Sequence, residues 1–423
     1  MFAGIKNRQT FPFIFNPMQK LLHSYKNAFS GLSPSTWWLS LVMLINRAGT
    51  MVMPFMTLYM TTRLHFNIIQ AGFVMALFGL GAVCGGILGG KLTDLFGFYN
   101  IQLVTLLSGG VLFIALGQMK DYTSICCVAF LLAMLNDSFR PANATAIAHY
   151  STGENRTRSY SLNRLSVNLG WACGGALGGF VASQNYQLLF WIDGLTNIAA
   201  ALLLLAVLSP ARNEHTPVRT YNKTKEKAAS PYKDRVYLAF IVFTIMLAYS
   251  FFQLFSVQPI FYNRVFFLSP FTIGLLMAVN GALVALIEMP VVFRLEGKRN
   301  SLSYISIGVL LIGASFIVYN VLPAGTWLAV FSTFLFTAGE IMCAPFLNAF
   351  WTKRSDSSNR GQYAGLYSVA WSVAQVLGPS TGSVIAERYG FKALWWVVGG
   401  MCTTACIGFN WLRLFISAKT NRA

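Results

Sequence analysis

The chain has 423 residues, of which 55% are hydrophobic and only 10% are charged. Soluble proteins carry about 25% charged residues, so this composition, with its repeated long apolar runs, excludes an ordinary soluble protein and indicates an integral membrane protein. The formal net charge of +18 reflects topology, because basic residues gather beside membrane spans, and we expect no nucleic-acid partner.

Twelve apolar stretches follow one another along the chain, each long enough for a helix to cross the ~30 Å hydrocarbon core of a bilayer. Helices are expected because each satisfies its own backbone hydrogen bonds in lipid. The sequence therefore predicts an all-α integral membrane protein. The predicted spans are residues 36–60, 70–90, 100–118, 122–147, 161–183, 187–208, 236–262, 271–293, 301–321, 326–351, 363–385 and 391–414.

A polar linker, residues 209–235, divides the spans into an N-terminal half (36–208) and a C-terminal half (236–414) of six helices each. Residues 1–35 and 415–423 are predicted to be tails. With the N-terminus inside, 23 Lys and Arg fall in cytoplasmic segments and five in outside loops. The positive-inside rule therefore predicts that both tails and the linker are cytoplasmic.

The two halves repeat each other. "GFVMALFG" at 72–79 aligns with "GLLMAVNG" at 274–281, and Pro141 and Pro345 occupy matching places in the fourth span of each half. Parallel six-helix halves with a site between them, near the middle of the membrane, are a transporter architecture. We therefore predict two pseudo-symmetric halves around a central site.

The sequence carries no pattern that predicts a cofactor or a catalytic centre. The seven cysteines lie in apolar runs and the four histidines are scattered, so we expect neither a disulfide framework nor a metal site. The Gly-rich stretches lack a phosphate-loop lysine and no hydrolytic triad is visible. We expect no enzyme activity, and transport energy from an ion gradient.

The twelve spans, the basic linker and "GGKLTDLFG" at 89–97 resemble the major facilitator superfamily over nearly the whole chain. Within it, "RPANA" at 140–144 and "GWACGGALGG" at 170–179 are most similar to motifs of the twelve-span drug:proton antiporter branch, although Gly175 replaces that branch's proline. The resemblance implies two motifs in this chain. They are a gating motif (Gly90, Lys91, Asp94, Gly97) and a helix-5 motif (Gly170, Gly174, Gly175, Gly178, Gly179).

The gating motif departs from the family pattern, because Phe98 and Tyr99 stand where basic residues usually follow the last glycine. In the family, an acid at the position of Asp94 holds the two halves together in the outward-facing state, partly against a helix N-terminus of the other half. We expect Asp94 to serve such a gate, with Lys91 or the other half as its partner.

Six ionisable side chains lie well within predicted spans, where each costs roughly 2.5–3.5 kcal/mol at a helix centre on insertion scales. We expect five of them to face a central cavity and to take part in proton coupling, and we expect the sixth, Asp193, to be structural. Static ion pairs for the arginines, and packing hydrogen bonds for the glutamates, remain alternatives. The five are Arg47, Asp137, Arg140, Glu288 and Glu340.

Aromatic and amide side chains predict the substrate-binding wall, because such surfaces suit amphipathic or cationic organic solutes. The candidates are Tyr249, Gln253, Trp371 and Gln375. We predict a monomeric, proton-coupled transporter in a bacterial plasma (inner) membrane, whose partners are protons, lipid and a small-molecule substrate. The favoured function is export of small organic or drug-like solutes by antiport. The alternatives are import of a nutrient or siderophore-like solute by symport, and a non-transporting receptor or scaffold.

Overall fold

The computed structural model describes residues 31–151, 155–208, 230–295, 297–355 and 359–420, and regular structure in these ranges is helical. Residues 1–30, 209–229 and 421–423, which hold most of the predicted tails and linker, lie outside the described residues. The helices are α2 (Pro34–Ala48), α3 (Val52–Thr62), α4 (Ile68–Phe96), α5 (Phe98–Gln118), α6 (Tyr122–Tyr150), α7 (Arg156–Gln184), α8 (Tyr186–Val207), the short η1 (Pro231–Lys233), α9 (Arg235–Gln253), α10 (Gln258–Val265), α11 (Pro270–Leu295), α12 (Ser301–Val321), α13 (Thr326–Arg354) and α14 (Arg360–Thr420).

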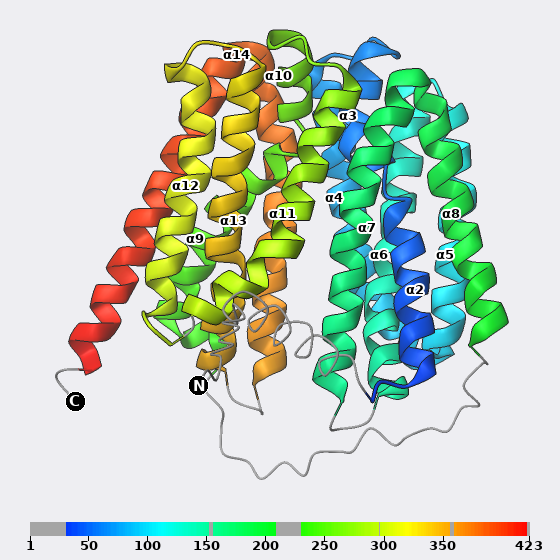
Figure 1. Ribbon diagram of the computed structural model, residues 1–423, viewed down its shortest axis with the longest axis horizontal. Coiled ribbons are helices and arrows are strands. Elements are labelled where there is room, and N and C mark those ends of the chain that lie inside the picture. The colour runs from blue at the N-terminus through cyan, green and yellow to red at the C-terminus, as the bar shows by residue number, and fades with distance from the viewer. Residues whose placement is uncertain (1–30, 152–154, 209–229, 296, 356–358, 421–423) are drawn as a thin grey trace, which may run out of the picture.

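Two helical bundles stand side by side, α2–α8 in one and α9–α14 in the other (Figure 1). Within the described ranges, eleven helical segments are long and apolar enough to cross a membrane. The last of them, in α14, covers two predicted spans, which meet at Gly390 with φ 83° and ψ 162°. That positive φ suits glycine and turns the chain back, so Figure 1 shows α14 as an orange limb and a red limb. The predicted twelve-span helical fold is confirmed.

The first span of each half is broken, which the sequence did not predict. Residues 36–60 form α2 and α3 around a break at 49–51, and residues 236–262 form α9 and α10 around a break at 254–257. The first break is held by Asp193 of α8, whose carboxyl oxygens accept the backbone N–H groups of Met51 and Val52 at 2.9 and 2.8 Å. A helix N-terminus leaves such donors without partners, so Asp193 has the structural role expected of it.

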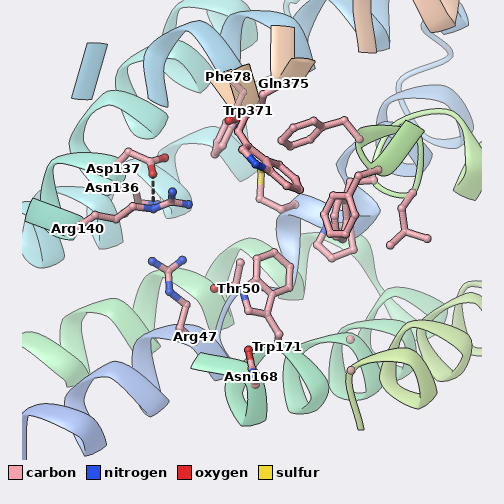
Figure 2. A pocket seen from close by; sticks show the side chains of 18 of the residues that line it. Arg47, Thr50, Phe78, Asn136, Asp137, Arg140, Asn168, Trp171, Trp371 and Gln375 are labelled. Atoms are coloured by element: carbon pink, nitrogen blue, oxygen red, sulfur yellow. Dashed lines mark ion pairs between the residues drawn. The ribbon is translucent and has the colours of Figure 1, made fainter. Parts of the chain in front are cut away.

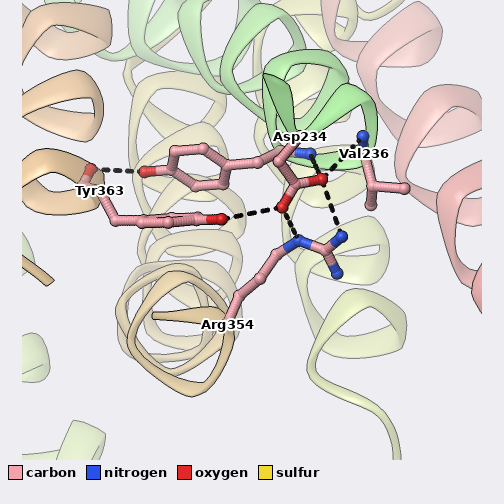
Figure 3. Close-up of polar contacts among 5 residues, drawn as sticks. Asp234, Val236, Arg354 and Tyr363 are labelled. Atoms are coloured by element: carbon pink, nitrogen blue, oxygen red, sulfur yellow. Dashed lines mark hydrogen bonds and ion pairs between the residues drawn. The ribbon is translucent and has the colours of Figure 1, made fainter. Parts of the chain in front are cut away.

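The start of α9 is tied to α13 and α14 by a group of contacts that we call the Asp234 cluster (Figure 3). Asp234 accepts the N–H groups of Val236 and Tyr237 at 3.1 Å, and Arg354 Nη2 donates to Asp234 Oδ1 at 2.8 Å. The Tyr363 hydroxyl donates to Asp234 Oδ2 at 3.1 Å. Burial alone would raise the pKa of Asp234, but the hydrogen bonds from Arg354 and the helix N-terminus outweigh it and lower that pKa.

The α4–α14 seam between the halves is tight at one end and open at the other. A Cβ on Gly72 would lie 2.4 Å from Ser383 Cβ, and the Ile68 N–H donates to Glu387 Oε2 at 3.3 Å. Nothing lies within 4 Å of a Cβ on Gly90. We call the end that carries Asn67 and Ser269 the closed end, and the end that carries Gly97 and Asn300 the open end.

The α7–α11 seam shows the same gradient. A Cβ on Gly179 would lie 2.7 Å from Gly274 Cα, whereas one on Gly175 would lie 3.3 Å from Met277 Cβ. Small residues let helix backbones approach closely in a membrane, and here they do so most at the closed end. The halves therefore meet as a V, and the space between them widens toward the open end.

Candidate functional site

A cavity of about 660 Å³ lies between the two halves, and helices of both halves contribute to its wall. This volume is typical of small-molecule sites, which range over about 300–1,000 Å³. The structure brings seven of the candidate residues of the sequence together here. They are Arg47, Asp137, Arg140, Gly175, Glu340, Trp371 and Gln375.

The N-terminal wall carries two arginines and one carboxyl group. Arg140 Nε lies 2.7 Å from Asp137 Oδ1, one turn earlier on α6, and the Arg140 side chain is 69% exposed whereas that of Asp137 is 14% exposed. Arg47 projects from the last turn of α2, and its guanidinium is turned toward that of Arg140 (Figure 2). The Arg47 Nε is buried without a hydrogen-bond partner among the residues that the structure describes.

The helix-5 motif, in α7, presents two faces. Three of its glycines lie against the first span: a Cβ on Gly170 would lie 2.4 Å from Arg47 Cβ, and Gly174 and Gly178 follow at four-residue steps against Ala48 and Met51. The other two, Gly175 and Gly179, lie against α11 of the opposite half. The first face brings the backbone of Arg47 close to α7, and the second belongs to the seam between the halves.

The C-terminal wall carries Glu340 on α13. Asn280 of α11 donates through Nδ2 to Glu340 Oε2 at 3.1 Å and to Thr337 Oγ1 at 2.9 Å. Among the described residues, no Lys or Arg pairs with this carboxyl group. The cavity therefore sets an amide-bound carboxyl group of one half against the arginines of the other.

Aromatic rings of both halves complete the wall. Trp371 lies 5.5 Å from Phe251 and 6.2 Å from Phe252 between ring centroids, both edge-on, and Trp171 lies 5.7 Å from Phe255. Edge-on packing fixes these rings and leaves apolar faces for a ligand.

Three candidates lie away from the cavity lining. Gln253 donates through Nε2 to the Gly378 carbonyl at 2.9 Å, and Tyr249 accepts the Thr381 hydroxyl at 2.9 Å, so both join α9 to α14. Glu288 forms an ion pair across the α7–α11 seam with Arg164.

The gating motif lies at the open end, where α4 gives way to α5. Gly97 has φ 80° and links the two helices, and Lys91 and Asp94 are exposed. Asp94 forms no ion pair with a described residue in this state, in which the two halves are apart at the open end.

Two groups of polar residues were missed by the sequence analysis. Amides line the cavity from several helices, and Asn46 Nδ2 donates to Asn197 Oδ1 at 2.9 Å. Isolated asparagines inside apolar spans were the available signal. Arg164 was also missed as the partner of Glu288, because it lies 124 positions away in the other half. The cavity amides are Asn46, Asn136, Asn168, Asn197, Asn280 and Asn348.

A family model described as Major Facilitator Superfamily matches residues 39–379 and, in a second match, residues 306–423. The chain belongs to the major facilitator superfamily. It is similar to a "Na(+), Li(+), K(+)/H(+) antiporter" of Planococcus maritimus, with 25% identity over 87% of this chain and 93% of the relative. It is also similar to the class C tetracycline resistance protein of Escherichia coli, with 24% identity over 81% of this chain and 86% of the relative.

The fold matches solved transporters of the same architecture. A crystal structure of the peptide transporter POT superposes with a TM-score of 0.76, covering 93% of this chain and 96% of the other at 16% identity. The family and these relatives are transporters, not enzymes, so this superfamily member is a multi-pass membrane transporter of small molecules.

Proposed function

We propose that this chain is a proton-coupled secondary transporter that exports small organic solutes by antiport. The observation that carries the proposal is the cavity of about 660 Å³, walled by aromatic rings and by ionisable groups of both halves. An organic solute of drug size needs such a volume and a few placed polar groups. Isolated ionisable groups in a membrane interior are costly, so their presence supports a function.

Alternating access follows from the V shape. Glycines pack the halves together at the closed end, and open space surrounds Gly86 and Gly90 near the other. With the predicted cytoplasmic termini, the open end faces the cytoplasm, where an exporter collects its solute. The gating motif then contacts the opposite half only when the open end closes. This agrees with the exposed side chain of Asp94 in the present state.

Proton coupling is assigned to Glu340 and to the Asp137–Arg140 pair. A carboxyl group changes its proton affinity when its surroundings alternate between water and a closed interior, or when a neighbouring cation moves. Glu340 is bound by an amide, Asn280, so its proton affinity responds to the change between water and a closed interior. Asp137 is bound by a cation, Arg140, so its proton affinity responds to movement of that cation. Solute and proton then compete for the same cavity.

Exchange of alkali cations for protons is a second candidate, favoured by the relative of Planococcus maritimus. The cavity supports it less well. An alkali cation needs a small cage of oxygen atoms, whereas two guanidinium groups and several aromatic rings line this larger space.

The test uses the full chain in proteoliposomes under an imposed pH gradient, with a panel of organic solutes and with Na⁺ and K⁺. Inside-out vesicles with an acidic lumen are expected to accumulate a solute and to release it when a protonophore removes the gradient. Glu340→Gln is expected to abolish the response, and Asp121→Asn, at an exposed helix start, is the matched control. Accumulation only in right-side-out vesicles with an acidic exterior would establish import by symport, and exchange of cations alone would establish the second candidate.

A further inference from the structure

The cavity holds a cation, Arg47, that no described residue neutralises directly. Arg47 forms no ion pair with a described residue, and its buried Nε has no hydrogen-bond partner. The one carboxyl group on the same wall, Asp137, is already bound by Arg140 Nε. Two guanidinium groups therefore share one carboxylate, which leaves this wall with a net charge of +1.

An uncompensated arginine in a membrane interior is destabilising, so its retention points to a ligand of opposite charge. A permanent lock between helices, the alternative expected from the sequence, would need a carboxylate partner for Arg47. Glu340 stands on the wall of the other half and is hydrogen-bonded to Asn280. Among the described residues, the electrostatic neighbours of Arg47 are Arg140, which repels it, and Asp137, which attracts it.

The surroundings of Arg47 are shaped for an anionic head with an apolar body. Figure 2 shows the Arg47 guanidinium directed toward that of Arg140, with Thr50 and Asn168 on the side of Arg47. Further into the same cavity, Trp171 and Trp371 present their rings. Guanidinium groups bind carboxylates through paired hydrogen bonds, and aromatic walls bind planar apolar bodies.

We propose that the cavity binds an amphipathic organic carboxylate, whose head lies between Arg47 and Arg140 and whose apolar body lies against Trp171 and Trp371. This inference rests on the proposed transport function and names its solute class. The carboxylate neutralises the net charge of the wall. Loading the anion therefore lowers the electrostatic cost of moving Arg47 through the occluded state, so an anionic solute is preferred to a neutral one of the same shape.

The test compares three probes that share one ring system: 1-naphthoate, its neutral amide, and 1-naphthylmethylammonium. Binding to the full chain in nanodiscs is measured by calorimetry, and empty nanodiscs correct for partition into lipid. Because a charge-assisted pair is replaced by a neutral contact, 1-naphthoate should bind at least roughly tenfold more tightly than the amide. Equal binding of all probes, tighter binding of the ammonium, or no binding of 1-naphthoate overturns the inference.

Variants distinguish a specific loss of carboxylate binding from misfolding of the protein. Arg47→Gln should bring the affinity for 1-naphthoate close to that for the amide, while amide binding, which also reports folding, stays within about twofold. Arg47→Lys retains the charge without the paired donors and should fall between the two. Arg63→Gln removes an exposed cation near the closed end, stacked over Tyr186, and should leave the preference intact. An unchanged preference in Arg47→Gln overturns the inference.

Two further arms keep this inference distinct from the proposed function. Inorganic phosphate that binds as tightly as 1-naphthoate would indicate a bare-anion site and overturn the assignment of an amphipathic solute. Proton-driven export of neutral or cationic solutes, without carboxylate preference, would remove the anion site and leave the proposed function standing. Loss of all proton-driven export, with carboxylate preference retained, would refute the proposed function and leave the anion site standing.

Discussion

Asp193 should be among the most sensitive positions for stability, although it lies outside the cavity lining. Its side chain is fully buried, and its two oxygens accept three contacts of 2.8–3.1 Å from the N–H groups of Met51 and Val52. Asp193→Ala leaves the Val52 N–H without a partner inside the bundle and leaves the Met51 N–H only the Gly49 carbonyl, at 2.9 Å. The α2–α3 break would then lose the group that holds it.

The magnitude follows from those donors. The buried Val52 N–H left without a partner costs about 1–3 kcal/mol, and the lost hydrogen bonds of the Met51 N–H cost about 0.5–1.5 kcal/mol more. Removing the carboxyl group also removes the free-energy cost of burying it, so the net destabilisation is smaller than the cost of the donors alone. We expect Asp193→Ala to lower the free energy of unfolding by about 3 kcal/mol, and Asp193→Asn, which keeps one oxygen acceptor, by about 1–2 kcal/mol.

The assay is equilibrium unfolding of the purified protein by SDS in mixed micelles. Asp121→Ala is the matched control, because Asp121 also caps a helix, through the N–H of Ser124, but is exposed. Loss of an exposed N-cap costs about 1 kcal/mol, so the control should lower the unfolding SDS fraction less than Asp193→Ala does. The reasoning is refuted if Asp193→Ala unfolds like the control, or if Asp193→Asn is as damaging as Asp193→Ala.

Glu288→Gln should leave Arg164 without its partner across the α7–α11 seam, and spin-label distances across the open end should lengthen; an unchanged distance distribution would contradict a tether. The pKa of Asp234 is lowered in the folded protein, so its stabilisation is complete above the unfolded value of about 3.9 and is lost as pH falls through the folded value. The melting temperature of the wild type should therefore fall more steeply in that acid range than that of Asp234→Asn, and parallel curves would refute the linkage. Gly179→Val places a Cβ 2.7 Å from the facing helix, so the closed end should fail to seal and transport should drop; transport at the wild-type rate would contradict tight packing at this end. Asp94→Asn should slow transport while leaving substrate affinity little changed, and a large loss of affinity would contradict a gating role.

The site was only partly predictable from the sequence. Arg47, Asp137, Arg140 and Glu340 were recognisable because each is an ionisable residue in an apolar span, and all four line the cavity. Glu288 carried the same signal but pairs with Arg164 at the seam. Position within a span gives the depth of a side chain, whereas the direction in which it faces depends on how the helix is rotated against its neighbours.

The sequence by itself determined the membrane class, the twelve spans and the division into two related halves. Each follows from local properties, because the thickness of the bilayer and the need to satisfy backbone hydrogen bonds act on every span separately. The tertiary structure alone decided that α2 ends at Ala48, where Asp193 holds the next helix start. It also decided that Arg47 forms no ion pair with a described residue while Arg164 forms one. The Asp193 contacts join residues 142 and 141 positions apart within the N-terminal half, and the Arg164–Glu288 pair joins residues 124 positions apart in different halves. Both form only when helices distant in the sequence are packed together.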